Sequence, residues 1–277
     1  MKLRRKVCFM VLLLLALFGV RKPIELQAAG KTVKKPAKTY TIYVNRKQNI
    51  VNVVDGKSGK LVRAMYCSTG RGFITIPGYF LTQEKYLWHE LNGGVYGQYC
   101  TRICGSYLFH SVPYYRPDVT QLETHLYNQL GTQASMGCIR LATVDAKWIY
   151  DNCKLKTQVI IGEKKQLKKP KRPLLKISTE KSAGWDPTDP NPNNPYYPVL
   201  KLKKNSMIKV KMNSKFKPKS VITVSSPFTK SAKLLKYVKV SGKVNTKKSG
   251  KYKIKYTVTD PATELTKTFV IKFKVVK

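Results

Sequence analysis

The sequence predicts a mainly β protein with short helices, arranged as two domains. Apolar and polar residues alternate in short runs over most of the chain, which is the period of a β-strand. Helical signals occur in only two segments, 120–131 and 143–153. The composition changes across 164–198, which is basic and rich in proline, so this segment reads as a linker between the two domains. A chain of 277 residues is long enough for two domains, and its 42% hydrophobic content supports packed cores.

The first domain, 40–163, should be a sheet with two helices. Alternating runs at 40–44 and 51–53 should pair as a hairpin, and a third strand is expected at 61–67. A buried strand over 107–110 ends at His110, and a last strand over 157–162 closes the domain. Thr120 and Glu123 form a capping box, which predicts a helix from 120 to 130 that Gly131 ends. A second helix is expected over 143–153, with Asp145 in its first turn.

The second domain, 199–277, should be a β-sandwich. Short alternating runs recur at regular spacing, over 207–212, 220–224, 237–240, 252–259 and 269–276. Helical periodicity is absent, and the domain contains neither Cys nor His. We therefore expect no catalytic group in this domain.

The charge of the chain points to anionic partners. Lys and Arg number 53 against 14 Asp and Glu, a formal net charge of +39. A chain of this charge binds polyanions, which include nucleic acid, an anionic envelope polymer and a membrane surface. The cellular location decides among these three.

The N-terminus has the layout of a signal peptide. A basic start precedes an apolar run over 7–20, and small residues follow at 28–29. Arg21 and Lys22 directly after the run leave an uncleaved membrane anchor open as the alternative. We interpret 1–29 as a signal peptide or membrane anchor and 30–39 as a basic tether. Either interpretation places the two predicted domains outside the cytoplasm, which disfavours nucleic acid as the partner.

The cysteines predict one reactive thiol. Six are present, and loss of Cys8 with a cleaved signal would leave five, an odd number that suggests one free thiol and up to two disulfides. Cys67 and Cys153 either pair or remain buried thiols. Without a Cys-x-x-Cys pair and with only three histidines, we expect neither a metal site nor a cofactor.

The candidate catalytic residues lie around Cys138 and at His110. Cys138 follows Gly137 and precedes Arg140, and His110 lies 28 residues upstream. A nearby histidine can take the thiol proton and later return it, while positive charge and backbone N–H groups favour the thiolate. The alternative for any single cysteine is a small buried apolar residue.

The residues around this stretch resemble a known family. Phe109-His110-Ser111, Ser135-Met136-Gly137-Cys138-Ile139-Arg140-Leu141 and the helix at 145–150 make 40–163 similar to YkuD-like L,D-transpeptidase catalytic domains. The resemblance implies that Cys138 attacks the carbonyl of the third residue of a peptidoglycan tetrapeptide stem and releases the terminal D-alanine. The amine of a second stem then resolves the acyl-enzyme into a crosslink.

The resemblance also implies roles for individual residues. His110 would be the general base and acid, and Ser111 would orient it through its backbone carbonyl. The backbone near Gly137, with Ser135, would form an oxyanion and substrate site. Arg140 would hold a stem carboxylate by a fork of hydrogen bonds or, equally, form a structural salt bridge.

Two departures from the family pattern leave alternatives open. Met136 stands where the family usually has histidine, so a catalytically degenerate wall-binding protein is one alternative. The interval from His110 to Cys138 is longer than usual, and the helix predicted over 120–130 would account for the excess, as a flap over the cleft. With water as acceptor, the enzyme would instead be an L,D-carboxypeptidase.

Residues 199–277 resemble bacterial immunoglobulin-like surface modules. The resemblance runs from Val240-Ser241-Gly242 to 256–260 and implies a fold, not an activity. This part of the chain has 22 lysines against Asp260 and Glu264. We expect it to hold the protein against anionic cell-wall polymers or a membrane surface.

Overall fold

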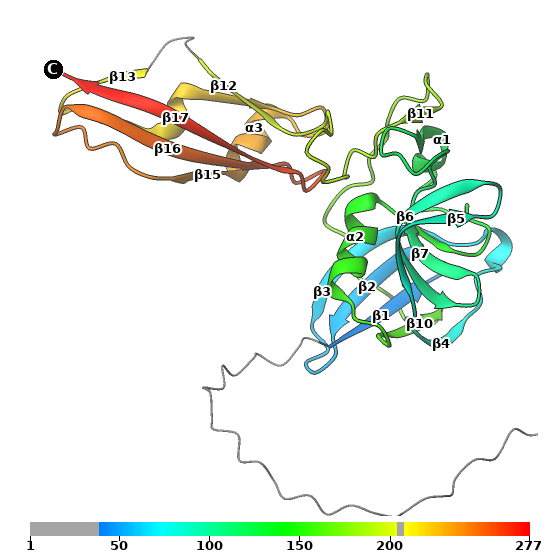
Figure 1. The fold of residues 1–277 in the computed structure, drawn as a ribbon. Coiled ribbons are helices and arrows are strands. Elements are labelled where there is room, and N and C mark those ends of the chain that lie inside the picture. Colours follow the sequence, from blue (N-terminus) through cyan, green and yellow to red (C-terminus); the bar gives the residue numbers. More distant parts are fainter. Residues whose placement is uncertain (1–38, 204–207) are drawn as a thin grey trace, which may run out of the picture. The chain divides into compact units, whose positions relative to one another are not determined.

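The computed structural model describes residues 39–203 and 208–277, and both parts are mostly β-structure (Figure 1). The predicted signal segment at 1–29, most of the tether and Cys8 lie outside the described residues. No helix within the described residues has the length and apolar character needed to cross a membrane.

The first domain is built on one sheet of nine strands. The order is β4-β10-β1-β2-β3-β9-β7-β6-β5. The strands are β1 (Tyr40–Asn45), β2 (Ile50–Asp55), β3 (Leu61–Ser68), β4 (Gly78–Leu81), β5 (Lys85–Leu91), β6 (Val95–Cys104), β7 (Tyr107–Ser111), β9 (Ile139–Leu141) and β10 (Gln158–Gly162), with a 3-10 turn η1 (Arg71–Phe73). The predicted hairpin is confirmed, since β1 and β2 pair antiparallel, and β10 closes against β1 in parallel.

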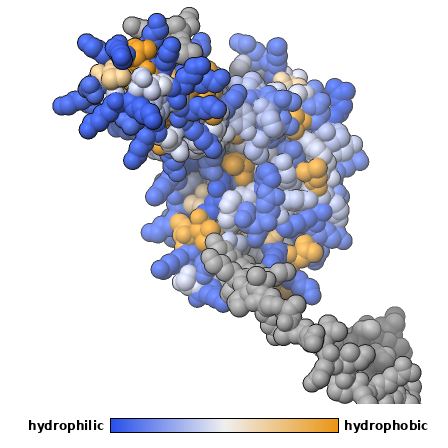
Figure 2. Space-filling model, turned by 60° about the vertical axis from the view of Figure 1, so that its left-hand side comes forward, coloured by the Kyte–Doolittle hydropathy of each residue, from blue (hydrophilic) through white to orange (hydrophobic). Residues whose placement is uncertain are grey.

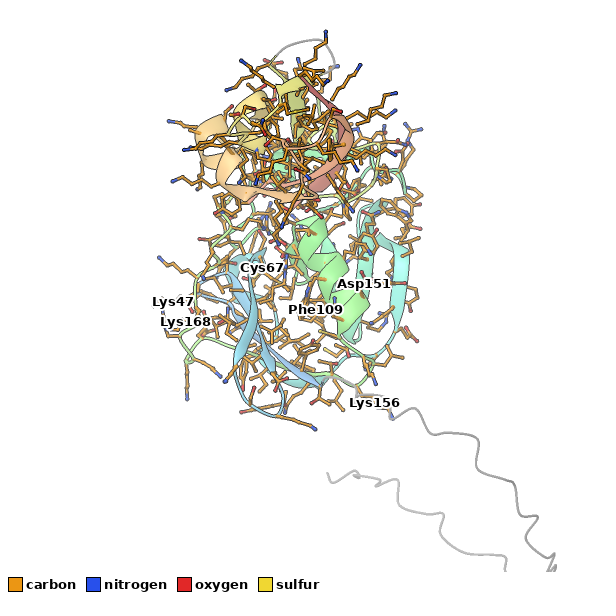
Figure 3. The ribbon with its side chains drawn as sticks, turned by 90° about the vertical axis from the view of Figure 1, so that its left-hand side faces the viewer. Lys47, Cys67, Phe109, Asp151, Lys156 and Lys168 are labelled. Atoms are coloured by element: carbon orange, nitrogen blue, oxygen red, sulfur yellow. The ribbon has the colours of Figure 1, made fainter. Side chains whose placement is uncertain are left out.

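The core lies between this sheet and helix α2 (Thr143–Asn152), which contacts β6, β7 and β9. Alternate residues of the strands, including Cys67 and Phe109, pack with Ala146 and Ile149 of the helix (Figure 3). Burying these apolar groups removes them from water and stabilises the helix on the sheet. The helix predicted over 143–153 is confirmed. Its position holds the strands that carry the candidate catalytic residues.

A buried carboxylate fixes the start of α2. The side chain of Asp145 is 1% exposed and lies between the guanidinium groups of Arg63 and Arg172. Arg63 donates from Nε and Nη2 to Asp145 Oδ1 at 2.9 and 2.6 Å. This acid therefore does more than favour the helix dipole, because it ties α2 to β3 and to the segment that follows the domain.

The helix predicted over 120–130 is wrong in extent. Only α1 (Thr124–Tyr127) is helical, and the residues before it form a short strand β8 (Leu122–Glu123) that pairs with β11 (Ala183–Gly184). Asp118 accepts hydrogen bonds from both the N–H and the hydroxyl of Thr120, so the capping residue serves a turn instead. Leu122 and Tyr127 are fully buried, which argues against a mobile flap.

The segment interpreted as a linker, 164–198, is packed on the first domain. Besides the β8–β11 pair, Thr124 donates from its backbone N–H to the Ser182 carbonyl. Asp186 Oδ2 accepts from Thr143 N–H at 2.8 Å, and Thr188 Oγ1 accepts from Val144 N–H at 3.2 Å. These residues satisfy N–H groups that the first turn of a helix leaves without intrahelical partners.

The second domain is a sandwich of two sheets, as predicted. One sheet pairs β12 (Val199–Leu202) with β14 (Ile222–Ser225), and the other has the order β13-β17-β16-β15. Its strands are β13 (Ile208–Lys211), β15 (Val238–Ser241), β16 (Gly250–Thr259) and β17 (Thr266–Val276), with short helices η2 (Pro218–Val221), α3 (Ser231–Leu234) and η3 (Leu235–Tyr237). Val210, Ile222, Ile254, Tyr256 and Phe273 are among the residues of its core.

The described cysteines are all free thiols, so the expected disulfides are absent from residues 39–203 and 208–277. Cys67, Cys100 and Cys153 are buried. Burial raises the pKa of the Cys153 thiol to about 12, which keeps it protonated and unreactive. Cys67 and Cys153 are thus buried thiols, one of the two alternatives left open by the sequence.

Candidate active site

Two parallel strands bring the sequence-predicted residues together. β7 and β9 pair in register, with His110 opposite Arg140 and Ser111 opposite Leu141. Cys138 immediately precedes β9. Although His110 and Cys138 are far apart in sequence, both line one cavity of about 190 Å³. Parallel pairing across a long connection is what produces this convergence.

The imidazole of His110 is held in one orientation. The ring is buried, and its Nδ1 lies 2.5 Å from the carbonyl oxygen of Ser111. A carbonyl can only accept, so Nδ1 carries the proton and Nε2 keeps its lone pair. Burial, followed by the positive charge of Arg140, lowers the pKa of His110 to about 3, against the smaller opposing effect of the Ser111 carbonyl. The resting ring is therefore neutral, as a general base must be.

Ser111 also ties β7 to its neighbour. Its hydroxyl accepts from the Gln98 N–H at 2.8 Å and donates to the Val112 carbonyl at 2.8 Å. Gly97, the residue before Gln98 on β6, lets this strand approach the imidazole closely. A Cβ on Gly97 would lie 2.9 Å from the Cβ of His110, which real structures essentially never show. Gly97 is thus a residue of the site that the sequence interpretation missed.

A tight turn presents Cys138. Ser135 Oγ accepts from the Gly137 N–H at 3.1 Å and donates to the Cys138 carbonyl at 2.6 Å, while Thr75 Oγ1 donates to the Gly137 carbonyl at 2.7 Å. Gly137 has φ +122°, a backbone conformation that residues with a Cβ rarely adopt. A Cβ at this position would also lie only 2.8 Å from the Tyr107 ring. Ser135 therefore organises the turn through its hydroxyl.

The thiol of Cys138 is partly buried and lies 3.4 Å from the Ser106 carbonyl oxygen, to which it donates. Burial raises its pKa above the ordinary value of a thiol, although the Leu108 N–H and the charges of Arg140 and Arg102 act in the opposite direction. Neighbouring positive charge is present, as the sequence predicted. The desolvation of the thiolate outweighs it, so the resting pair is a neutral thiol beside a neutral imidazole.

The guanidinium of Arg140 faces the same cavity and forms no ion pair with any residue that the structure describes. The residue is 9% exposed, and its Nε and Nη1 have no hydrogen-bond acceptor within the described residues. Glu123 lies close enough to influence its pKa, but the two form no salt bridge within 4.0 Å. A buried guanidinium with two of its nitrogens lacking acceptors is costly, so a bound anion would stabilise it. Of the two alternatives for Arg140, this geometry favours the substrate carboxylate.

The rim of the cavity comes from the β5–β6 hairpin and from the turn before Cys138. Met136 is 68% exposed and lines the cavity at the position where histidine was expected from the family resemblance. His89 also lines it, and its ring stacks on Tyr86 at 4.4 Å between centroids. His125, by contrast, lies on α1 and contacts Gln129 outside the cavity lining.

The sequence interpretation assigned no role to three residues of this site. Gly97, Thr75 and Tyr107 shape the backbone around His110 and Gly137 rather than contact a reacting atom. A signal existed for one of them: Thr75 belongs to the Thr-Ile-Pro-Gly segment, in which polar and turn-forming residues follow a strand. Gly97 and Tyr107 carried no local signal, because their importance arises from pairing across the sheet.

Two family models match parts of this chain. Residues 39–161 match the family model described as the L,D-transpeptidase catalytic domain (YkuD), and residues 200–270 match the one described as bacterial surface protein, Ig-like domain. Residues 39–161 form an L,D-transpeptidase catalytic domain. The C-terminal module is an immunoglobulin-like domain, and both family predictions are confirmed.

Individual relatives resemble only part of the chain. The protein named "Putative L,D-transpeptidase YciB" of Bacillus subtilis (strain 168) is 49% identical over 58 residues, which are 21% of this chain and 29% of that protein. A fused Zn-dependent amidase/peptidase/peptidoglycan-binding domain-containing protein from Clostridium acetobutylicum ATCC 824 is 32% identical, with a TM-score of 0.35 over 44% of this chain and 51% of that one. An L,D-transpeptidase from Mycobacterium tuberculosis H37Rv is 21% identical, with a TM-score of 0.37 over 45% and 57%.

Proposed function

We propose that this protein is an exported L,D-transpeptidase that crosslinks or remodels peptidoglycan through a thioester on Cys138. The observation that carries the proposal is the shared cavity of Cys138 and His110, with the imidazole held by the Ser111 carbonyl. The family of residues 39–161 implies peptidoglycan stem peptides as substrate. The signal-like N-terminus supports an exported location, in the cell wall or tethered to the membrane.

The proposed acylation begins from a neutral pair. Because His110 Nε2 is unprotonated and the Cys138 thiol keeps its proton at rest, the thiolate forms as the substrate carbonyl approaches and the imidazole takes the proton. The imidazolium then gives that proton to the amine of the leaving D-alanine. A second stem's amine attacks the thioester, gives its proton to the imidazole and restores the thiol.

The negative oxygen of the tetrahedral intermediate needs a donor near Cys138. Ser135 Oγ already accepts the Gly137 N–H, so that group does not serve. We therefore assign the contact to the backbone N–H of Cys138. Loss of one such donor costs about 2.7–4 kcal/mol in other acyl-transfer enzymes, so the orientation of this turn should matter as much as the base.

Arg140 supplies the test of substrate binding. Arg140→Gln should raise the KM for a tetrapeptide donor by about tenfold or more, because a charge-assisted hydrogen bond contributes about 1.5–3 kcal/mol. Arg140→Lys should recover part of that loss, since it restores the charge without the fork. Steady-state release of D-alanine measures both variants. An unchanged KM in both would assign Arg140 a structural role.

The products separate the proposal from its alternatives. The full-length protein is incubated with disaccharide tetrapeptide, and the products are separated by chromatography and identified by mass. Crosslinked dimers joined between third residues support transpeptidation, whereas tripeptides alone indicate an L,D-carboxypeptidase. Unchanged tetrapeptide would favour a catalytically degenerate wall-binding protein, the alternative that Met136 motivates.

A further inference from the structure

One face of the second domain carries a ladder of lysines. On the sheet β13-β17-β16-β15, the register places Lys251 opposite Lys274 and Lys253 opposite Lys272, and Lys209 lies opposite Lys274 on the other side. Side chains of alternate residues share a face, so this face holds eight exposed lysines: Lys209, Lys211, Lys239, Lys251, Lys253, Lys255, Lys272 and Lys274. We call it the lysine face.

The lysine face has no compensating charge. The other residues that share it are Ser241, Thr257, Thr259, Thr266, Thr268, Val270 and Val276, none of them acidic. None of the eight lysines forms an ion pair within residues 39–203 and 208–277. Hydrophilic residues predominate on the side of the protein that the space-filling view shows (Figure 2). Like charges directly opposite each other destabilise a sheet, so the arrangement has a cost in the unbound protein.

Protection of the sheet edges against aggregation does not explain why so many lysines share this face. Lysines that prevent edge-to-edge pairing belong on edge strands. Here the strand order makes β17 and β16 the two central strands, and these carry five of the eight lysines. Solubility alone is served equally well by mixed charges. A ligand that neutralises several lysines at once would offset the repulsion.

The composition of the face indicates the chemistry of that ligand. Residues 199–277 contain no arginine, the residue whose planar fork binds carboxylates and phosphates in a bidentate manner, so this face can bind an anion only through point charges. Lysine binds phosphate as a point charge. The face presents no aromatic ring on which nucleic-acid bases would stack, and Val270 is its only strongly exposed apolar side chain. Insertion into a bilayer would need a larger apolar surface.

We propose that the lysine face binds a linear polymer of polyol phosphate, a chain with one phosphodiester charge per repeat and no bases. Successive lysines on one strand are about 6.7 Å apart and neighbouring strands about 4.8 Å apart, so the face offers a grid of cations to a flexible anionic chain. The lysine face lies on residues outside the catalytic domain, and the proposal does not depend on Cys138 chemistry.

The experiment titrates the full-length protein with poly(glycerol phosphate). A face variant carries Lys209→Gln, Lys251→Gln, Lys253→Gln, Lys272→Gln and Lys274→Gln. The control variant loses the same charge at exposed lysines of the same domain that lie off the face, by Lys215→Gln, Lys217→Gln, Lys230→Gln, Lys233→Gln and Lys236→Gln. Circular dichroism confirms folding of both, which is expected because the face variant removes repulsion.

The face variant should lose about tenfold or more in affinity and the control less than about threefold, and wild-type binding should weaken as salt shortens the screening length. Equal losses in the two variants would overturn the proposal, because net charge alone would then explain binding. Tighter binding to phosphatidylglycerol vesicles, or to single-stranded DNA of equal phosphate number, would assign the face to a membrane or to nucleic acid instead. Binding indifferent to salt would also contradict it.

Discussion

His110→Gln should lower the rate of D-alanine release by about 10²–10⁴-fold, the usual contribution of a general acid–base group. Glutamine preserves much of the ring's volume and can still donate a hydrogen bond to the Ser111 carbonyl, but it cannot accept the thiol proton. His125→Gln is the matched control, because that histidine lies on α1 outside the cavity lining. The control should retain wild-type rates, measured with the same tetrapeptide donor. A His110→Gln rate within threefold of wild type would remove His110 from the proposed mechanism.

The same residue sets the pH dependence. With the pKa of His110 lowered to about 3 and that of Cys138 raised, kcat/KM should show no loss on acidification from neutral pH through the ordinary histidine range. A loss centred on the ordinary histidine pKa of about 6.5 would show that the imidazole is not buried as described.

The free energy of unfolding should depend on pH differently from kcat/KM. Between about pH 6.5 and the folded-state pKa, the unfolded chain binds a proton that the folded chain does not, so stability falls as the pH is lowered. His110→Gln should remove that part of the fall.

Asp145→Asn should lower the free energy of unfolding of the first domain by up to about 3–5 kcal/mol, because it removes the buried carboxylate between two largely buried guanidinium groups. Their remaining acidic partner, Glu264, lies 2.9 Å from Arg63 and 3.4 Å from Arg172, and its side chain is 35% exposed. Arg63 and Arg172 have side chains that are 16% and 10% exposed, so water cannot replace the lost partner fully. Urea unfolding followed by tryptophan fluorescence reports on this domain alone, since the three tryptophans lie at 88, 148 and 185.

Asp151→Asn provides the matched comparison on the same helix. Asp151 lies near the other end of α2 and pairs with Lys147 at 2.6 Å, with both side chains solvent-accessible (Figure 3). An exposed pair spaced four residues apart contributes about 0.3–0.5 kcal/mol. Equal losses in the two variants would contradict the role assigned to the buried arginine–aspartate cluster.

Those strands and site residues that carry a local sequence pattern could be predicted from the sequence. Alternation predicted the β1–β2 hairpin, and the strand that ends near His110 followed from a short apolar run. The helix over 120–130 failed because Leu122 pairs with Gly184, some sixty residues away, and local capping signals do not register such a partner. For the same reason, the cap of α2 by Asp186 was missed.

The electrostatics of the site were harder to predict than its residues. The charge near Cys138 is visible in the sequence as Arg140, and it suggested a lowered thiol pKa. The pKa is raised instead, because burial is a property of the assembled sheet and exceeds the effect of the charges. Three features of the site required the fold: the cavity, the orientation of His110 by Ser111, and the Arg140 guanidinium, two of whose nitrogens have no acceptor among the described residues.

The most direct test of the central claim is the intact mass of the full-length protein after incubation with disaccharide tetrapeptide in the absence of an acceptor. The account predicts a mass increase equal to the donor minus alanine, located on Cys138 by peptide mapping, and its loss in Cys138→Ala, which keeps the other four described thiols. An adduct that persists in Cys138→Ala, or an unmodified protein beside unchanged donor, would contradict the account.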